Sequence, residues 1–108
     1  MNVCTGYYST EISWTLVNDD VASSGCSSPY CCNSPNYYFN NYYCPSNLNE
    51  YTGCGILAKG NYKLYCRDSW GDGWNSAYVK IPQSHMPNNK WCQNFRTGYS
   101  YIEHLMIV

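Results

Sequence analysis

Eight cysteines in a chain of 108 residues constrain this fold more than any other feature of the sequence. An even count at this density predicts a framework of four disulfides, which persist only in oxidising compartments. The series contains no C-x2-C pair, which argues against a zinc site and a C-x-x-C redox motif. We therefore expect an extracellular or cell-surface protein. The cysteines stand at Cys4, Cys26, Cys31, Cys32, Cys44, Cys54, Cys66 and Cys92.

Cys31 and Cys32 are neighbours in the sequence, and disulfide geometry restricts how they pair. The Cα atoms of consecutive residues lie about 3.8 Å apart, below the roughly 4.4–6.8 Å of ordinary disulfides. We therefore expect Cys31 and Cys32 to bond to different partners, so that the surrounding segment is held at two places. The connectivity of the other cysteines stays open, because the sequence does not select among the remaining pairings.

The length of the chain predicts one small domain over residues 1–108, and its charge argues against two classes of binding partner. The chain is too short for two ordinary domains, so disulfides would supplement a core of limited size. A net charge of −1 and a pI near 6.0 argue against nucleic acid and anionic membranes, since both require a basic patch. No apolar run approaches the about 20 residues of a membrane-spanning helix, so we expect no membrane insertion.

Apolar and polar residues alternate with a period of two along most of the chain. The clearest runs are 11–17, 61–66, 77–81 and 101–108, filled by β-branched and aromatic residues and separated by Gly, Pro, Asn and Asp. Ile12, Trp14 and Leu16 share one face of the first run, and Tyr62, Leu64 and Cys66 share one face of the second. The last run ends apolar on both faces, so we expect it to be central in a sheet or covered by a neighbouring molecule. The pattern predicts an all-β fold, a small antiparallel β-sandwich with a long disulfide-stapled loop.

The stretch from Cys26 to Cys54 lacks this alternation and is rich in Ser, Pro, Asn and Tyr. Three cysteines inside it would tie it down, so we predict an ordered, cross-linked excursion on the surface of the sandwich. Ser28 and Ser34, each followed by proline, are candidate sites of O-glycosylation. Six tyrosines are candidate contacts with other copies of the chain or with glycans: Tyr30, Tyr37, Tyr38, Tyr42, Tyr43 and Tyr51.

The segment Asp68–Asn75, with the sequence DSWGDGWN, lies between two predicted strands. One interpretation is a purely structural turn, since Gly71 and Gly73 permit positive φ. A second is a Ca²⁺ site, because Asp68, Asp72 and Asn75 offer the oxygen ligands that Ca²⁺ prefers, although their spacing is not that of an EF-hand. A third is direct ligand contact through Trp70 and Trp74. All three stay open, and Ca²⁺ is the one candidate cofactor.

Two segments resemble a known family. Residues 11–16 (EISWTL) resemble its "SEISW-L" strand, and residues 60–67 lead into an octapeptide similar to the DSYGDGWN modules of secreted and surface proteins in algae, other microbial eukaryotes and bacteria. The match covers roughly half of the chain and is most specific in the octapeptide. The resemblance implies an extracellular β-sandwich module, often repeated in surface or matrix proteins, without established catalytic residues. This chain differs from the family in three respects: it carries one copy of the module, it has Trp70 where Tyr is commoner, and it contains the Cys31-Cys32 loop.

The sequence carries no recognisable catalytic motif. His85 and His104 belong to no H-E-x-x-H pattern, and neither G-x-S-x-G nor a phosphate-binding loop occurs. Glu11, Glu50, Glu103 and the two motif aspartates could form a glycosidase-type pair, but their spacing singles out none of them. We therefore expect no enzymatic activity.

Two non-enzymatic functions remain. The favoured one is a self-assembling structural subunit of a surface filament, appendage or matrix, because the low charge weakens repulsion between copies and the apolar last strand needs a cover. The alternative is a Ca²⁺-dependent, adhesive glycan-binding module in which Tyr and Asn contact sugars. Glycan binding by the isolated domain with and without a chelator would distinguish the two.

Overall fold

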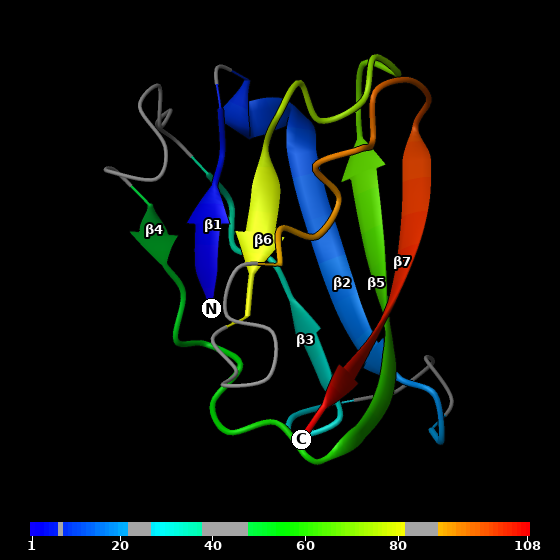
Figure 1. The fold of residues 1–108 in the computed structure, drawn as a ribbon. Helices are drawn as coiled ribbons and strands as arrows, with labels where there is room; N and C mark the ends of the chain where they lie inside the picture. The colour runs from blue at the N-terminus through cyan, green and yellow to red at the C-terminus, as the bar shows by residue number, and fades with distance from the viewer. Residues whose placement is uncertain (7, 22–26, 38–47, 82–88) are drawn as a thin grey trace.

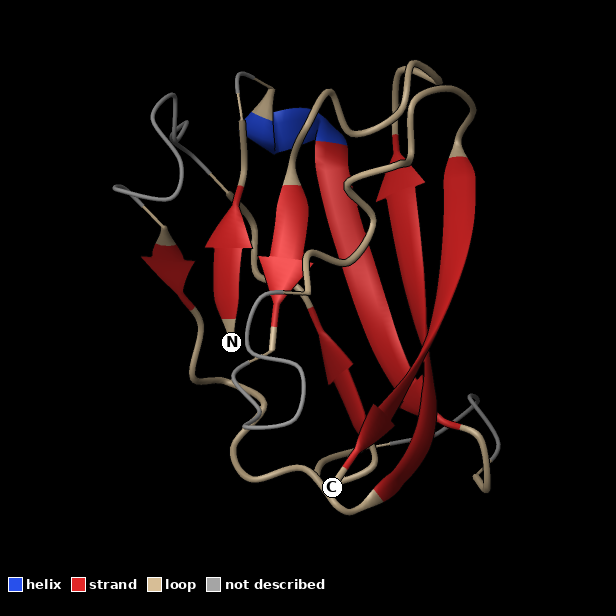
Figure 2. Ribbon diagram, in the orientation of Figure 1, coloured by secondary structure: helices blue, strands red, loops and turns tan. Residues whose placement is uncertain are grey.

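The computed structural model describes residues 1–6, 8–21, 27–37, 48–81 and 89–108, and these form two antiparallel sheets that pack against each other (Figures 1 and 2). The smaller sheet has the strand order β4-β1-β6 and the larger the order β3-β2-β5-β7. A short 3-10 turn, η1 (Ser9–Glu11), leads into β2. The predicted all-β sandwich is confirmed. The strands are β1 (Asn2–Cys4), β2 (Ile12–Asn18), β3 (Cys31–Asn33), β4 (Asn49–Glu50), β5 (Gly60–Asp68), β6 (Tyr78–Lys80) and β7 (Ser100–Ile107).

The pairing of β2 with β5 forms the middle of the larger sheet. It runs from Ile12 opposite Asp68 to Asn18 opposite Tyr62. The side chains that the alternation assigns to the core are buried, including Trp14 and Leu16 on β2 and Leu64 on β5. Because alternate residues of a strand face opposite sides of the sheet, this register also places a polar row on the outer face.

Large aromatic side chains fill the space between the sheets. Trp14, Trp74, Tyr62 and Phe95 are among the largest fully buried residues. The indole Nε1 of Trp14 donates a hydrogen bond of 3.1 Å to the hydroxyl of Tyr37. Buried Trp and Tyr usually satisfy their polar atoms in this way, so the pair adds specificity to an otherwise apolar core.

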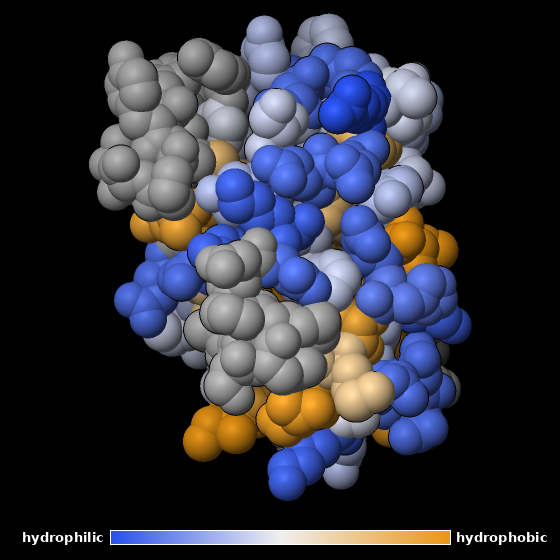
Figure 3. All heavy atoms as spheres, in the orientation of Figure 1, coloured by the Kyte–Doolittle hydropathy of each residue, from blue (hydrophilic) through white to orange (hydrophobic). Residues whose placement is uncertain are grey.

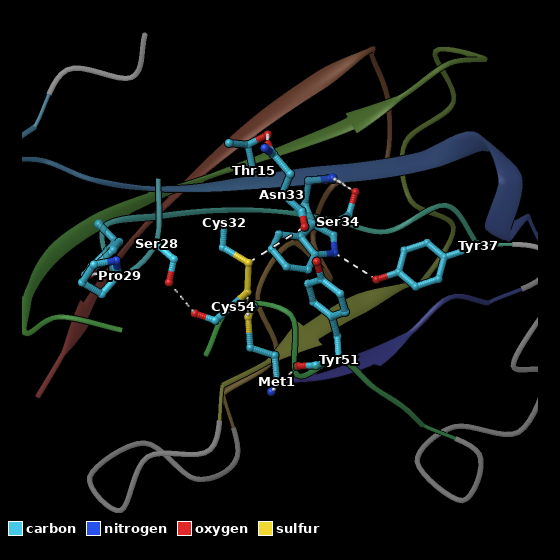
Figure 4. The surroundings of a disulfide bond; sticks show 12 residues. Met1, Thr15, Ser28, Pro29, Cys32, Asn33, Ser34, Tyr37, Tyr51 and Cys54 are labelled. Atoms are coloured by element: carbon cyan, nitrogen blue, oxygen red, sulfur yellow. Dashed lines mark hydrogen bonds between the residues drawn. A yellow bond between two sulfur atoms is a disulfide. The ribbon is translucent and has the colours of Figure 1, made fainter. Parts of the chain in front are cut away.

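Tyrosines of the 26–54 segment take different positions. Tyr37 is 7% exposed, and half-buried Tyr51 packs edge-to-face on Trp14 at 5.7 Å between ring centroids (Figure 4). The expectation of an exposed tyrosine surface is therefore wrong for Tyr37, because the buried indole of Trp14 requires a hydrogen-bond partner. Tyr30 is 44% exposed. Tyr38, Tyr42 and Tyr43 lie outside the described residues.

The disulfides fasten loops to the larger sheet. Cys32 on β3 bonds to Cys54, and Cys66 on β5 bonds to Cys92, with Cα separations of 5.3 and 6.5 Å. Cys4 and Cys31 are also disulfide-bonded, which confirms that Cys31 and Cys32 have different partners. No cysteine in the described part of the chain is free. Cys26 and Cys44 lie outside the described residues.

The last strand, β7, lies at the edge of the larger sheet and pairs with β5. A central position, one of the two alternatives expected for this strand, is therefore wrong. Leu105 and Ile107 face the core and are buried, whereas Ile102 and Met106 are 46% and 48% exposed. The face seen in Figure 3 is mainly hydrophilic, with apolar atoms along its left, lower and right edges, and β7 forms the right edge. Among the described residues, no helix is long and apolar enough to cross a membrane.

Candidate functional site

Three carboxylates meet where β2 begins and β5 ends. Glu11 closes η1, Asp68 closes β5, and Asp72 lies in the turn that follows. The antiparallel register places Ile12 opposite Asp68, and the backbone N–H of Ser69 donates to the carbonyl of Glu11 at 2.9 Å. One oxygen from each carboxylate lies within 4.8 Å of the other two. This carboxylate cluster lies at the end of the sandwich where η1 is drawn (Figures 1 and 2).

Two oxygens of the carboxylate cluster are buried without a hydrogen-bond partner. Asp68 is 2% exposed, and its Oδ2 accepts a 2.7 Å hydrogen bond from the backbone N–H of Asp72. Its other oxygen, Oδ1, has no partner, and neither has the buried Oε2 of Glu11. Buried polar groups normally have a hydrogen bond, and buried charges are normally paired or bound to a metal. These two atoms therefore lack the interactions that a bound cation would supply.

Burial and mutual repulsion raise the pKa values of two carboxylates in the cluster. Burial raises the pKa of Asp68, and the Asp72 side chain adds to the rise, while backbone N–H groups of Asp72 and Trp70 act in the opposite direction. Burial also raises the pKa of Glu11, with smaller contributions from the charges of Asp72 and Asp68. A cation bound among the three oxygens would favour the ionised forms and reverse these shifts.

Both glycines of the DSWGDGWN turn have a backbone conformation that favours glycine, and Gly73 is also required by packing against backbone atoms. Gly71 and Gly73 each have φ near +77°, a region that L side chains rarely adopt. A Cβ on Gly71 would lie 2.6 Å from the Tyr99 ring, and one on Gly73 would lie 2.5 Å from the carbonyl oxygen of Phe95. The structural interpretation therefore accounts for the glycines, but not for the unpartnered carboxylate oxygens.

The other residues of the turn have separate roles. Trp74 is buried, and its Nε1 donates to the carbonyl of Arg67 at 2.8 Å, whereas Trp70 is 72% exposed. Asn75 donates to the carbonyl of Gly73 at 3.4 Å and lines a separate hollow that also includes Arg96. The structure thus brings Asp68 and Asp72 together and adds Glu11, while Asn75 lines the other hollow.

A groove of about 760 Å³ adjoins the carboxylate cluster. Its walls come from the start of β2, the end of β5, the segment after β3, and Tyr99. Arg67 Nη1 donates to Thr15 Oγ1 at 3.0 Å, and this hydroxyl donates to Asn33 Oδ1 at 2.8 Å, so one polar row crosses three strands. Figure 4 shows Thr15 and Asn33 together beside β2. Glu11 and Asp68 also line the groove.

The remaining sequence candidates lie away from the carboxylate cluster. Ser28 is exposed and donates to the carbonyl of Cys54 at 3.2 Å, whereas half-buried Ser34 accepts a 3.0 Å hydrogen bond from the backbone N–H of Trp14. Glu103 accepts a hydrogen bond from the backbone N–H of Cys92 at 3.3 Å, and His104 is exposed on β7. Glu50 is exposed on β4, and His85 lies outside the described residues.

Glu11 is the functional candidate that reasoning on the motif alone missed. It lies far from Asp68 in the sequence, so spacing within the octapeptide could not include it. The available signal was its place directly before β2, which pairs with residues 62–68, because an antiparallel partner brings that position beside the turn.

No protein-family model matches the chain, and no curated protein or solved structure shows significant similarity to it. The resemblance to DSYGDGWN-type modules therefore stays a prediction. Function has to be inferred from the carboxylate cluster and the groove beside it.

Proposed function

We propose that the protein is a non-enzymatic, extracellular β-sandwich module that binds Ca²⁺ through Glu11, Asp68 and Asp72. The observation that carries this proposal is the pair of buried, unpartnered oxygens, Glu11 Oε2 and Asp68 Oδ1, next to a third carboxylate. The disulfides support an oxidising location.

The chemistry of the donor set favours a hard cation such as Ca²⁺ over zinc or copper. All three side chains offer oxygen, the ligand atom of hard cations, and no His or Cys joins them as zinc and copper sites require. Ca²⁺ binds oxygen at about 2.3–2.6 Å, so ligands on opposite sides of one ion lie about 4.6–5.2 Å apart. The 4.8 Å limit among the three oxygens therefore fits a single Ca²⁺ ion.

The same geometry disfavours a glycosidase. Retaining glycosidases hold their two carboxyl groups about 5–5.5 Å apart and inverting ones about 6.5–9.5 Å, to accommodate substrate or water. Here one oxygen from each of three carboxylates lies within 4.8 Å of the other two, so the site is a compact group of three acids and not a spaced pair. A bound cation would relieve the repulsion among the three carboxylates, so the cluster is better suited to binding an ion than to catalysis.

Calorimetric titration of Ca²⁺ into the oxidised, chelator-treated protein tests the proposal. We expect one ion per chain and a higher melting temperature with Ca²⁺ than with EDTA. Asp68→Asn should abolish both effects, since it removes a charge but retains an oxygen acceptor for the Asp72 N–H. Glu50→Gln on β4, an exposed carboxylate outside the cluster, is the matched control and should bind normally. Identical melting curves with Ca²⁺ and EDTA would contradict the Ca²⁺ proposal, and the DSWGDGWN segment would then be a purely structural turn.

Self-assembly is the second candidate function, and the apolar surface of β7 favours it. Ile102 and Met106 are about half-exposed on one face of this edge strand, and Ile56 is 93% exposed. Edge strands readily pair with other chains, and exposed apolar side chains on such a strand add area that a neighbouring copy could cover. Size-exclusion chromatography and negative-stain microscopy of the purified protein test this. A monodisperse monomer at high concentration would exclude the structural-subunit function.

A further inference from the structure

We infer that the groove beside the carboxylate cluster binds a neutral saccharide, with two sugar hydroxyls completing the coordination of Ca²⁺. This inference rests on the proposed Ca²⁺ function and adds the class of ligand. The groove volume of about 760 Å³ falls within the roughly 300–1,000 Å³ of small-molecule sites. Its lining joins an exposed ring, hydroxyls, an amide and a guanidinium to the carboxylates.

The polar row across the groove suits a ligand rich in hydroxyl groups. Arg67 is exposed and uses its Nη1 to donate to Thr15, which in turn donates to Asn33. These bonds fix the guanidinium on β5 and the amide on β3, on either side of β2. A guanidinium offers five N–H donors and an amide offers both donors and acceptors, while each sugar hydroxyl can donate and accept. The row can therefore bind several hydroxyls of one ligand.

Tyr99 supplies an aromatic surface at the same groove. Its side chain is 68% exposed, and its ring lies against Gly71, where a Cβ would approach within 2.6 Å. The absence of a side chain at Gly71 thus lets the ring rest on the turn that carries Asp72. An amphipathic tyrosine ring can pack against the C–H face of a sugar while its hydroxyl remains hydrated.

Ca²⁺ would retain open coordination positions toward the groove. One oxygen from each of Glu11, Asp68 and Asp72 fills three positions, whereas the ion takes about six to eight oxygen ligands. Asp68 Oδ2 already accepts the Asp72 N–H, so this carboxylate contributes mainly through Oδ1. Glu11 and Asp68 also line the groove, so a saccharide bound there lies within reach of the Ca²⁺ coordination positions that water would otherwise occupy.

Charge balance favours a neutral ligand over an acidic one. The three ionised carboxylates carry three negative charges, which one divalent cation and the guanidinium of Arg67 together offset. A loaded site is therefore neutral overall, and an anionic sugar would gain little net attraction. Without the ion, the carboxylates would repel an acidic saccharide.

Titration of the oxidised, Ca²⁺-loaded protein with cellotetraose, mannotetraose, galactotetraose and fully N-acetylated chitotetraose tests the inference, and tetragalacturonic acid provides the acidic comparison. At least one neutral tetrasaccharide should bind, and EDTA should abolish the binding. Arg67→Ala should weaken it about 10-fold or more, as expected for loss of a charged hydrogen bond, with Ca²⁺ affinity retained. His104→Ala on β7, also exposed but outside the groove lining, is the matched control and should bind as the wild type does.

The outcomes separate this inference from the Ca²⁺ proposal. Ca²⁺ binding without binding of any neutral tetrasaccharide overturns the saccharide inference alone. Wild-type saccharide affinity in Arg67→Ala, or binding of only tetragalacturonic acid, also overturns it. Absence of Ca²⁺ binding overturns the Ca²⁺ proposal, and saccharide binding that persists in EDTA overturns the role of the ion in the groove. Glu11→Gln serves as a second cation-site variant if Asp68→Asn fails to fold, and it should lose Ca²⁺ and saccharide together.

Discussion

Replacing Gly73 with alanine tests the packing of the DSWGDGWN turn most directly. Gly73 has φ of +77°, and an added Cβ would lie 2.5 Å from the Phe95 carbonyl oxygen and from the Arg96 carbonyl carbon. These are backbone atoms, so no side chain can rotate away to make room. Gly98 is a matched control, because its φ is +98° but a Cβ there would meet no atom within 4 Å.

The expected magnitudes follow from these two environments. A left-handed backbone costs a non-glycine residue about 1–2 kcal/mol, and this strain alone should destabilise Gly98→Ala. Gly73→Ala adds overpacking, which typically costs a further 1–3 kcal/mol. The two variants should therefore differ by about 1–3 kcal/mol in the free energy of unfolding, with Gly73→Ala the less stable.

Equilibrium denaturation of the oxidised proteins, followed by near-UV circular dichroism, measures this difference. A domain of this size loses roughly 4–8 °C in melting temperature per kcal/mol, so thermal melts provide a second reading. The turn carries Asp72, so Gly73→Ala should also weaken Ca²⁺ binding, whereas Gly98→Ala should weaken it less. Equal denaturation midpoints for the two variants would refute the packing argument.

Three further predictions concern the core, the carboxylate cluster and a disulfide. Tyr37→Phe leaves the buried indole N–H of Trp14 without its partner, so chemical denaturation should show a loss of about 1–3 kcal/mol. Glu11 and Asp68 have raised pKa values in the folded protein, so the chelator-treated protein should become less stable as the pH rises from about 4 through those raised values. Saturating Ca²⁺ should reverse this trend, and melting curves recorded across this pH range measure both effects. A rise in stability over that range without Ca²⁺ would contradict the sign. Replacing Cys66 and Cys92 together with serine opens a bridge of sequence separation 26, which should cost about 3–4 kcal/mol in denaturant; an unchanged midpoint would show that the bridge contributes little.

Features that depend on local geometry could be predicted from the sequence alone. The alternation in 11–17 and 61–66 identified Trp14, Leu16 and Leu64 as core residues, because successive side chains of a strand face opposite sides. The short distance between Cys31 and Cys32 excluded a bond between them, in agreement with the Cys32–Cys54 disulfide. Such conclusions require no knowledge of which strands are neighbours.

Features that depend on strand order and register could not be predicted without the paired strands. Glu11 joins Asp68 and Asp72 because β2 pairs antiparallel with β5 in one particular register. The apolar pattern of the last strand was compatible with a central position, yet β7 lies at an edge. Alternation specifies which face of a strand is buried but not its neighbours in the sheet, so the candidate site emerges only when the strands are paired.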